Sequence, residues 1–180
     1  MRSRADAQRV ESFMRAFGER ARVEATVHVT GGATAVLMGW RASTIDVDIK
    51  IEPDDDRLLR LLPVLKEELE VNVELASPAD FIPPLPGWET RSLFVTRHGS
   101  VNFYHYDLYA QALSKVERGH DQDRRDVAEM LRRGLIQPQL ALELFARIQP
   151  DLHRYPAIDP PTFRARVEVT FSNLTPHAPT

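Results

Sequence analysis

The feature that most constrains the fold is a run of strictly alternating side chains at residues 45–51, Ile-Asp-Val-Asp-Ile-Lys-Ile. Alternation with a period of two predicts a β-strand that buries one face and leaves the other polar. The expected buried face consists of Ile45, Val47, Ile49 and Ile51. The opposite face is expected to carry Asp46, Asp48 and Lys50, so that two carboxylates lie on the same side of the strand.

The spacing of the two aspartates indicates what they can bind. Because a strand rises about 3.3 Å per residue, the Cα atoms of Asp46 and Asp48 should lie roughly 6.5–7 Å apart. Both carboxylates can then reach one divalent cation or a close pair of cations. Mg²⁺ is usually held by one or two carboxylates together with substrate phosphates, which predicts a phosphate-handling site. The alternative is an edge strand whose charges discourage aggregation.

A glycine pair precedes this strand and favours the first interpretation. Residues 25–30 predict a strand and residues 33–38 the start of a helix, so Gly31 and Gly32 lie at a strand-to-helix turn. Glycine lets the backbone approach a ligand closely, and a helix N-terminus offers N–H groups to phosphate oxygens. A glycine pair alone usually indicates only a turn. Its combination with the following Asp-x-Asp strand is the specific signal.

In this order of elements the chain resembles the DNA polymerase β-like nucleotidyltransferases. That superfamily has a Gly-Gly or Gly-Ser turn followed by a strand with two acidic ligands. The segment from Arg41 to Asp48 is also similar to the Arg, Thr, Asp, Asp run of small prokaryotic members. The resemblance implies an α+β fold with a small mixed sheet, flanking helices and a C-terminal helical region. The core with its N-terminal helix is expected in residues 1–110, and the helical region, packed on it, in 111–175.

A second region resembles a narrower group. Leu113-Ser114-Lys115 and Asp123-Arg-Arg-Asp126 are similar to the Leu-x-Lys and Asp-x-x-Asp motifs of the AbiEii-type nucleotidyltransferase toxins, which include the mycobacterial MenT-like toxins. The resemblance spans about residues 24–134. One departure is the Gly-Gly pair, because many AbiEii-type members have Gly-Ser there.

The resemblance implies roles for particular residues. Asp46 and Asp48 would hold Mg²⁺ or Mn²⁺, and the triphosphate would contact Gly31, Gly32, Arg41 and Lys115. Lys50 is a second candidate to neutralise phosphate, or a solvated strand residue. Without the resemblance, Lys115 would be expected on the surface of an amphipathic helix. Asp126 would orient Lys115 or the acceptor, or act as a base; the alternative is an intrahelical pair with Arg124 or Arg133.

Polymerase β-like enzymes usually have a third acidic ligand on a neighbouring strand. A Gly-Ser turn at residues 99–100 predicts a hairpin that pairs His98 with Val101 and Phe94 with His105. Asp107 follows this hairpin and is the candidate for the third ligand. The competing interpretation makes Asp107 the N-cap of the next helix, with Glu74 as the fallback ligand.

Apolar periodicity predicts the remaining elements. Helices are expected at residues 5–21, 108–117, around 127–131, at 141–148 and at about 161–173, with a strand at 71–75 and disorder in the last five residues. A further helix should begin at Asp54-Asp55-Asp56, which we interpret as its acidic cap, and Pro63 is expected to kink it.

Composition limits the function classes. The 180 residues suffice for one domain with a helical appendage, and the absence of cysteine excludes disulfides and thiolate metal sites. The six histidines lack the spacing of a zinc site, and no P-loop or Gly-x-Gly-x-x-Gly motif is present. Neither a signal peptide nor a membrane-spanning apolar run is found, so a cytoplasmic location without membrane contact is expected.

The charge balance bears on partners. A net charge of −3 gives no general attraction to nucleic acid. A local basic patch could come from Arg118, Arg124, Arg125, Arg132 and Arg133, or these arginines could form surface pairs with neighbouring acids.

The resemblance therefore implies a metal-dependent nucleotidyltransferase. It would transfer a nucleoside monophosphate from an NTP to an acceptor hydroxyl, with a tRNA 3′ end or other RNA as leading acceptor. The toxin resemblance adds a cognate antitoxin protein as a partner. The alternatives are transfer to a protein or small-molecule hydroxyl, or a catalytically silent nucleotide-binding module.

Overall fold

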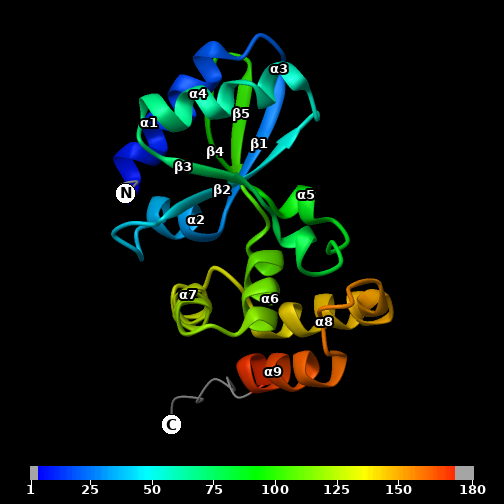
Figure 1. Cartoon of the computed structure of the whole chain (residues 1–180). Helices are drawn as coiled ribbons and strands as arrows, with labels where there is room; N and C mark the ends of the chain where they lie inside the picture. The colour runs from blue at the N-terminus through cyan, green and yellow to red at the C-terminus, as the bar shows by residue number, and fades with distance from the viewer. Residues whose placement is uncertain (1–3, 173–180) are drawn as a thin grey trace. The chain divides into compact units, whose positions relative to one another are not determined.

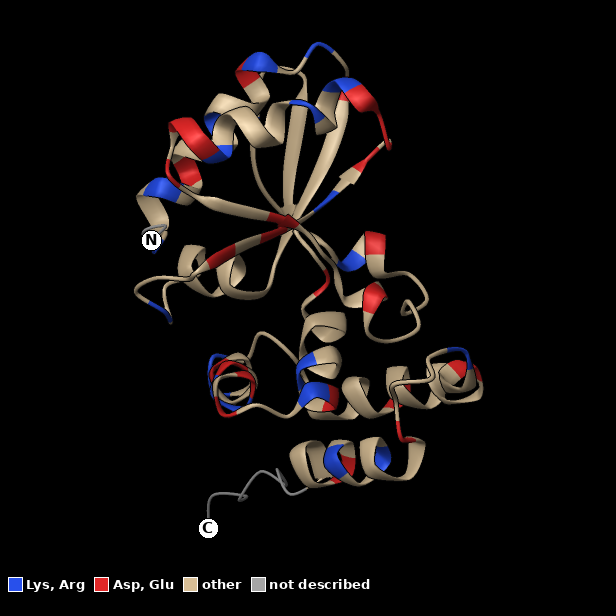
Figure 2. Cartoon of the chain, in the orientation of Figure 1, with Lys and Arg blue, Asp and Glu red and all other residues tan. Residues whose placement is uncertain are grey.

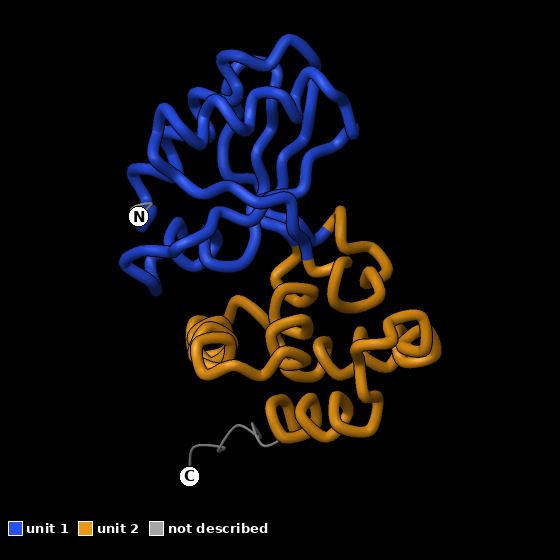
Figure 3. The backbone as a smooth tube through the Cα atoms, viewed as in Figure 1, with its two compact units in different colours: residues 1–77, 91–106 blue, residues 78–90, 107–180 orange. Residues whose placement is uncertain are grey.

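The structure is a computed structural model that describes residues 4–172 and divides into two compact units. The first, called here the strand unit, comprises residues 1–77 and 91–106 (Figure 3). The second, the helical unit, comprises residues 78–90 and 107–180.

The strand unit is built on a five-stranded mixed sheet (Figure 1). Its strands are β1 (Ala25–Thr30), β2 (Asp46–Glu52), β3 (Asn72–Leu75), β4 (Leu93–His98) and β5 (Val101–His105). They lie in the order β3-β2-β1-β5-β4. Strand β1 is antiparallel to β2 and parallel to β5, while β2 and β3 are parallel. The predicted α+β fold class is confirmed.

One face of this sheet carries the apolar core. Helices α1 (Ala7–Arg20), α2 (Gly31–Leu37) and α4 (Leu61–Glu68) contribute buried side chains to it. Phe17 of α1 contacts Phe103 of β5, with ring centroids 6.4 Å apart. The alternation of β2 explains this arrangement, because Val47, Ile49 and Ile51 are buried while the residues between them are only half-buried.

The acidic segment after β2 behaves as the sequence predicts. Asp55 is the N-cap of α3 (Asp56–Leu59), and its carboxylate accepts a hydrogen bond from the Arg57 backbone N–H at 2.8 Å. Helix α3 ends at Leu59, and Arg60 separates it from α4. The break has a simple cause: Pro63 has no N–H to donate to the Leu59 carbonyl.

Two predictions about strand details are wrong. Ile45 is not part of the buried face: it precedes β2 and its side chain is 61% exposed. In the hairpin, His98 pairs with Val101 as expected, but Phe94 pairs with Tyr104 and not with His105. The register shifts between Phe94 and Thr96, where one extra residue bulges out of β4.

The helical unit contains α6 (Leu108–Arg118), α7 (Asp121–Arg132), α8 (Pro138–Ile148) and α9 (Pro160–Ser172). Short helical turns lie at η1 (Pro78–Asp80) and η2 (Gln149–Arg154). Helix α5 (Trp88–Arg91) has all but its last residue in this unit's first segment. Phe145 of α8 and Phe163 of α9 pack edge to face, 4.9 Å apart. The predicted terminal helix is confirmed up to Ser172; Asn173 and the tail expected to be disordered lie outside the described residues. No helix within residues 4–172 has the length and apolarity needed to cross a membrane.

Candidate active site

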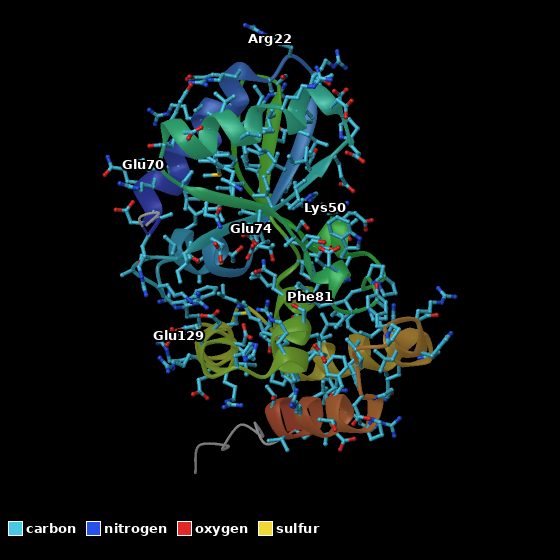
Figure 4. The ribbon with its side chains drawn as sticks, viewed as in Figure 1. Arg22, Lys50, Glu70, Glu74, Phe81 and Glu129 are labelled. Atoms are coloured by element: carbon cyan, nitrogen blue, oxygen red, sulfur yellow. The ribbon has the colours of Figure 1, made fainter. Side chains whose placement is uncertain are left out.

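Polar side chains gather on the face of the sheet opposite the core, where β2 and β3 run side by side. Register pairs Asp46 with Asn72 and Asp48 with Glu74. Because directly paired residues of neighbouring strands project from the same face, all four side chains lie together. Figure 2 shows acidic residues in red on both strands, and Figure 4 labels Glu74. The two aspartates are half-buried and Glu74 is exposed.

Asn72 links two of these carboxylates. Its side-chain Nδ2 donates hydrogen bonds to Asp46 Oδ1 at 2.5 Å and to Glu74 Oε1 at 3.0 Å. Asn72 is not among the site residues predicted from the sequence. The signal was present in the alternation of residues 71–75, but its meaning depends on knowing that β3 is the neighbour of β2.

The glycine pair lies beside the second aspartate. Gly31 has φ +60°, and a Cβ at this position would lie 2.7 Å from Asp48 Oδ2. A Cβ on Gly32 would lie 2.0 Å from Thr44 Oγ1 and 3.3 Å from Arg41 Nη1. Both positions therefore need glycine: the first for its left-handed backbone and the carboxylate, the second for the loop that closes on α2.

Two polar residues next to the aspartates, Thr44 and Lys50, are held by contacts within the strand unit. Thr44 Oγ1 donates to the Asp46 carbonyl oxygen at 2.9 Å, which anchors the start of β2. Lys50, labelled in Figure 4, pairs with Glu52 on the same strand at 2.7 Å. This pair gives Lys50 a structural partner next to the site, and its role toward phosphate stays a prediction.

The donor set fits a magnesium ion that is completed by substrate and water. Within residues 4–172, no group of three or more histidine or acidic side chains is arranged to hold a metal ion. Asp46 and Asp48 supply hard oxygen donors from one strand face, and Mg²⁺ typically takes one or two protein carboxylates plus phosphate oxygens. The protein ligands would thus be the two aspartates.

Asp107 occupies the position that the competing interpretation gave it. It is fully buried and is the N-cap of α6, where its Oδ1 accepts a hydrogen bond from the Tyr109 backbone N–H at 3.1 Å. The structure places it in the helical unit. Its role as a third metal ligand stays a prediction.

Lys115 and the Asp-x-x-Asp motif form a buried cluster in the helical unit. Lys115 Nζ lies 2.7 Å from Asp126 Oδ2 and 3.2 Å from Asp123 Oδ1. The three side chains are at most 6% exposed, and Arg118 completes the cluster at 2.7 Å from Asp123. The interpretation of Lys115 as a surface residue is therefore wrong. Asp126 contacts Lys115 because α6 and α7 bring the two motifs together.

The arginines of α7 mostly form ion pairs on their own helix. Arg124 pairs with Asp121. Arg132 and Arg133 both pair with Glu129, which Figure 4 labels. Their hydrogen bonds lower the pKa of Glu129 to about 2. This outcome matches the surface-pair alternative to a basic patch.

Sequence comparison identifies the family. Residues 8–156 match the family model described as "Nucleotidyltransferase of unknown function (DUF6036)". The chain belongs to this family. It also resembles the crystal structure of an antigenic nucleotidyltransferase-like protein from Paracoccidioides brasiliensis, with a TM-score of 0.51, 15% identity and coverage of 95% of this chain and 100% of that chain. No curated protein matches.

Membership in the DUF6036 family confirms the predicted nucleotidyltransferase superfamily, and the solved structure supports the fold. The narrower AbiEii-type relationship stays a prediction.

The helical unit of this DUF6036 nucleotidyltransferase contains a cavity of about 1050 Å³. Its wall comes from α6, α7, α9 and the segment from Gly134 to Pro138 that leads into α8, and is mainly apolar. Lys115 and Asp123 contribute to this wall, so the buried ion cluster borders a space of ligand size.

His105 is a buried titratable group whose pKa is lowered by folding. It lies on the core side of β5, with Nδ1 3.1 Å from Thr34 Oγ1. Burial lowers its pKa from 6.5 to about 4. The imidazole is therefore neutral at pH 7 and acts as a hydrogen-bonding core residue.

Proposed function

We propose that the chain is a metal-dependent nucleotidyltransferase that moves a nucleoside monophosphate from an NTP to an acceptor hydroxyl. The observation that carries the proposal is the packing of the Asp48 carboxylate against Gly31, on the strand face that also presents Asp46. The nucleotidyltransferase family of the chain supports it.

In the proposed reaction the acceptor oxygen forms a bond to the α-phosphorus, while the bond from this phosphorus to the leaving pyrophosphate oxygen breaks. The acceptor proton passes to solvent or to a carboxylate. Such transfer depends mainly on positioning and on electrostatic stabilisation of phosphate charge. Mg²⁺ or Mn²⁺, when bound, supplies neutralisation of that charge.

The protein residues have the following proposed roles. Asp46 and Asp48 hold the ion, and Asn72 fixes the orientation of the Asp46 carboxylate through its 2.5 Å hydrogen bond. Backbone amides of Gly31 and Gly32 contact the triphosphate. Arg41, whose guanidinium lies near Gly32, neutralises it.

Roles for Lys115, Asp126 and Asp107 rest on the family resemblance. Lys115 would have to exchange one of its two carboxylate partners for a phosphate oxygen. Asp126 would then position the ammonium group, and Asp107 would add a third ligand for the ion.

The acceptor and the biological setting belong to the same proposal. The resemblance to AbiEii-type toxins supports a tRNA 3′ end as acceptor and a cognate antitoxin as partner. Transfer to a protein or small-molecule hydroxyl is the second candidate, and it keeps the same metal site.

The test is incorporation of each α-³²P-labelled NTP into total tRNA, a protein pool and a small-molecule pool. Asp48→Asn should reduce incorporation at least about 100-fold, because it removes a charged metal ligand. Glu52→Gln is the matched control, since it removes one carboxylate from the same face of β2 and should keep near-normal activity. Equal activity of Asp48→Asn and wild type would refute the proposal. Wild-type NTP binding without transfer to any acceptor would favour the silent binding module.

A further inference from the structure

A row of aromatic side chains crosses the polar face of the sheet next to the aspartates. Register pairs Phe94 of β4 with Tyr104 of β5, Tyr104 with His28 of β1, and His28 with Lys50 of β2. Paired residues project from the same face, so the row lies on the face that presents Asp46 and Asp48.

The rings of this row touch one another. Phe94 and Tyr104 meet edge to face with centroids 5.5 Å apart, and Tyr104 and His28 are tilted at 5.7 Å. His28 continues to Tyr106 at 5.8 Å. These contacts make an aromatic strip that is fixed by the sheet and by its own packing.

The outer end of the strip is accessible. Phe94 is 60% exposed and Tyr104 is half-buried, whereas His28 is only 4% exposed. A large apolar ring on an edge strand gains little stability at such exposure. The packed rings behind Phe94 nevertheless hold it in place.

The strip lies within reach of the aspartates. The row that contains Asp48 and Thr30 is two residues further along β1 than the row of His28 and Lys50. With about 3.3 Å per residue and about 4.8 Å between strands, the Cα atoms of Tyr104 and Asp48 lie roughly 12 Å apart. A nucleotide whose phosphate lies at the carboxylates can extend its base over the rings.

We infer that Phe94 and Tyr104, backed by His28, form a stacking surface for a nucleobase of the substrate. This inference rests on the proposed nucleotidyl transfer at Asp46 and Asp48. Aromatic rings stack on every base, so such a surface tolerates different sequences. The net charge of −3 makes stacking an important source of affinity, because general electrostatic attraction to nucleic acid is weak here.

The base can belong to the donor NTP or to a single-stranded acceptor, and the test separates them. One arm measures binding of 2-aminopurine riboside triphosphate, and the other binding of a short single-stranded RNA with one 2-aminopurine. Stacking quenches the fluorescence of this base analogue, a signal that a purely structural residue would not affect. Inorganic triphosphate and the same RNA with an abasic site serve as probes without the base.

Phe94→Ala should weaken binding in one arm about 5- to 100-fold and abolish its quenching, as expected for loss of one stacked base. Binding of the probes without the base should not change, and Phe94→Trp should restore both signals. Leu93→Ala is the matched control: Leu93 is the preceding residue, 43% exposed, and pairs with His105 toward the opposite face. It should bind like wild type.

The outcomes distinguish this inference from the proposed function. If Phe94→Ala binds and quenches like wild type while Asp48→Asn loses nucleotide transfer, the stacking surface is wrong and the function stands. If Phe94→Ala loses quenching but no NTP is transferred by the wild type, the surface stands as a binding site and the enzymatic proposal fails. Absence of wild-type quenching in both arms overturns the inference.

Discussion

The strand unit and the helical unit each bring two aspartates together, in opposite ways. On β2, Asp46 and Asp48 are half-buried and lie beside Asn72 and the Gly31 backbone. On α7, Asp123 and Asp126 are at most 6% exposed and share the Lys115 ammonium.

This difference in burial predicts whether substitutions in each pair mainly affect folding or mainly affect binding and activity. A buried carboxylate is tolerated only when a cation and hydrogen bonds compensate its lost hydration, so the α7 pair is tied to stability. The β2 pair keeps contact with solvent and lies next to a backbone that approaches it closely. Substitutions there should affect binding and activity much more than folding.

Removing the cation of the buried cluster should have the largest effect on folding. Lys115→Met leaves Asp126 without its 2.7 Å partner, and we expect a loss of about 3–5 kcal/mol in the free energy of unfolding. Denaturant unfolding at pH 7 measures it. Lys66→Met, at a half-buried position on α4, is the matched control and should change stability by less than about 0.5 kcal/mol. A loss below about 1 kcal/mol for Lys115→Met would show that the cluster is not a structural unit.

On the core side of the strand unit, the buried titratable group His105 is neutral, unlike the ion-paired Lys115 cluster. Burial lowers the pKa of His105 from 6.5 to about 4. Between these two pH values the imidazole is protonated in the unfolded chain and neutral in the folded chain. The contribution of neutral His105 to the free energy of unfolding is complete above pH 6.5. It is lost as the pH falls toward 4, and the loss is about 3 kcal/mol in total.

The measurement is the unfolding free energy of wild type and His105→Gln between pH 7 and 4. The glutamine can hydrogen-bond to Thr34 but does not titrate. Between pH 7 and 4 the unfolding free energy of His105→Gln should therefore fall by about 3 kcal/mol less than that of wild type. Glu129 is present in both proteins, so its titration does not contribute to the difference between the two curves. Parallel curves would contradict the assignment.

The glycine turn beside Asp48 should be sensitive to added volume. A methyl group at residue 32 would lie 2.0 Å from Thr44 Oγ1 and 2.7 Å from its Cβ, so Gly32→Ala should cost about 1–3 kcal/mol. Gly39 in the following loop has φ +85°, and a methyl group there would have no neighbouring atom within 4 Å. Gly39→Ala should therefore cost only the backbone strain, about 1 kcal/mol, and thermal unfolding compares the two. A smaller loss for Gly32→Ala would mean that the loop moves away easily.

Much of the fold was predictable because local periodicity specified it. The alternation of residues 45–51 predicted β2, and the spacing of Val10, Phe13, Met14 and Phe17 predicted α1. Even so, alternation did not show that Ile45 lies outside the strand, since the strand end depends on pairing with β3. The bulge in β4 is likewise a feature of its pairing with β5, which the side-chain alternation of one strand does not show.

The candidate site was predictable in its own strand and not across strands. Asp46, Asp48 and the glycine pair could be read from the sequence, but the contact of Asn72 with Asp46 required the order of β3 and β2. Lys115 shows the same limit. Its burial depends on partners eight and eleven positions later on another helix, and periodicity within α6 does not show them.

The smallest expected effect concerns Asp107 and separates its two interpretations. Asparagine is as good an N-cap as aspartate, so Asp107→Asn should stay within about 0.5 kcal/mol of wild-type stability, while Asp107→Ala should lose about 1 kcal/mol. Chemical denaturation measures both variants. Both variants lack the negative charge that a metal ligand needs. Nucleotide incorporation by Asp107→Asn therefore shows whether Asp107 is a metal ligand as well as an N-cap. Full activity would leave Asp107 as a cap alone, and a loss of activity at unchanged stability would mean that its carboxylate also acts on the substrate or the ion.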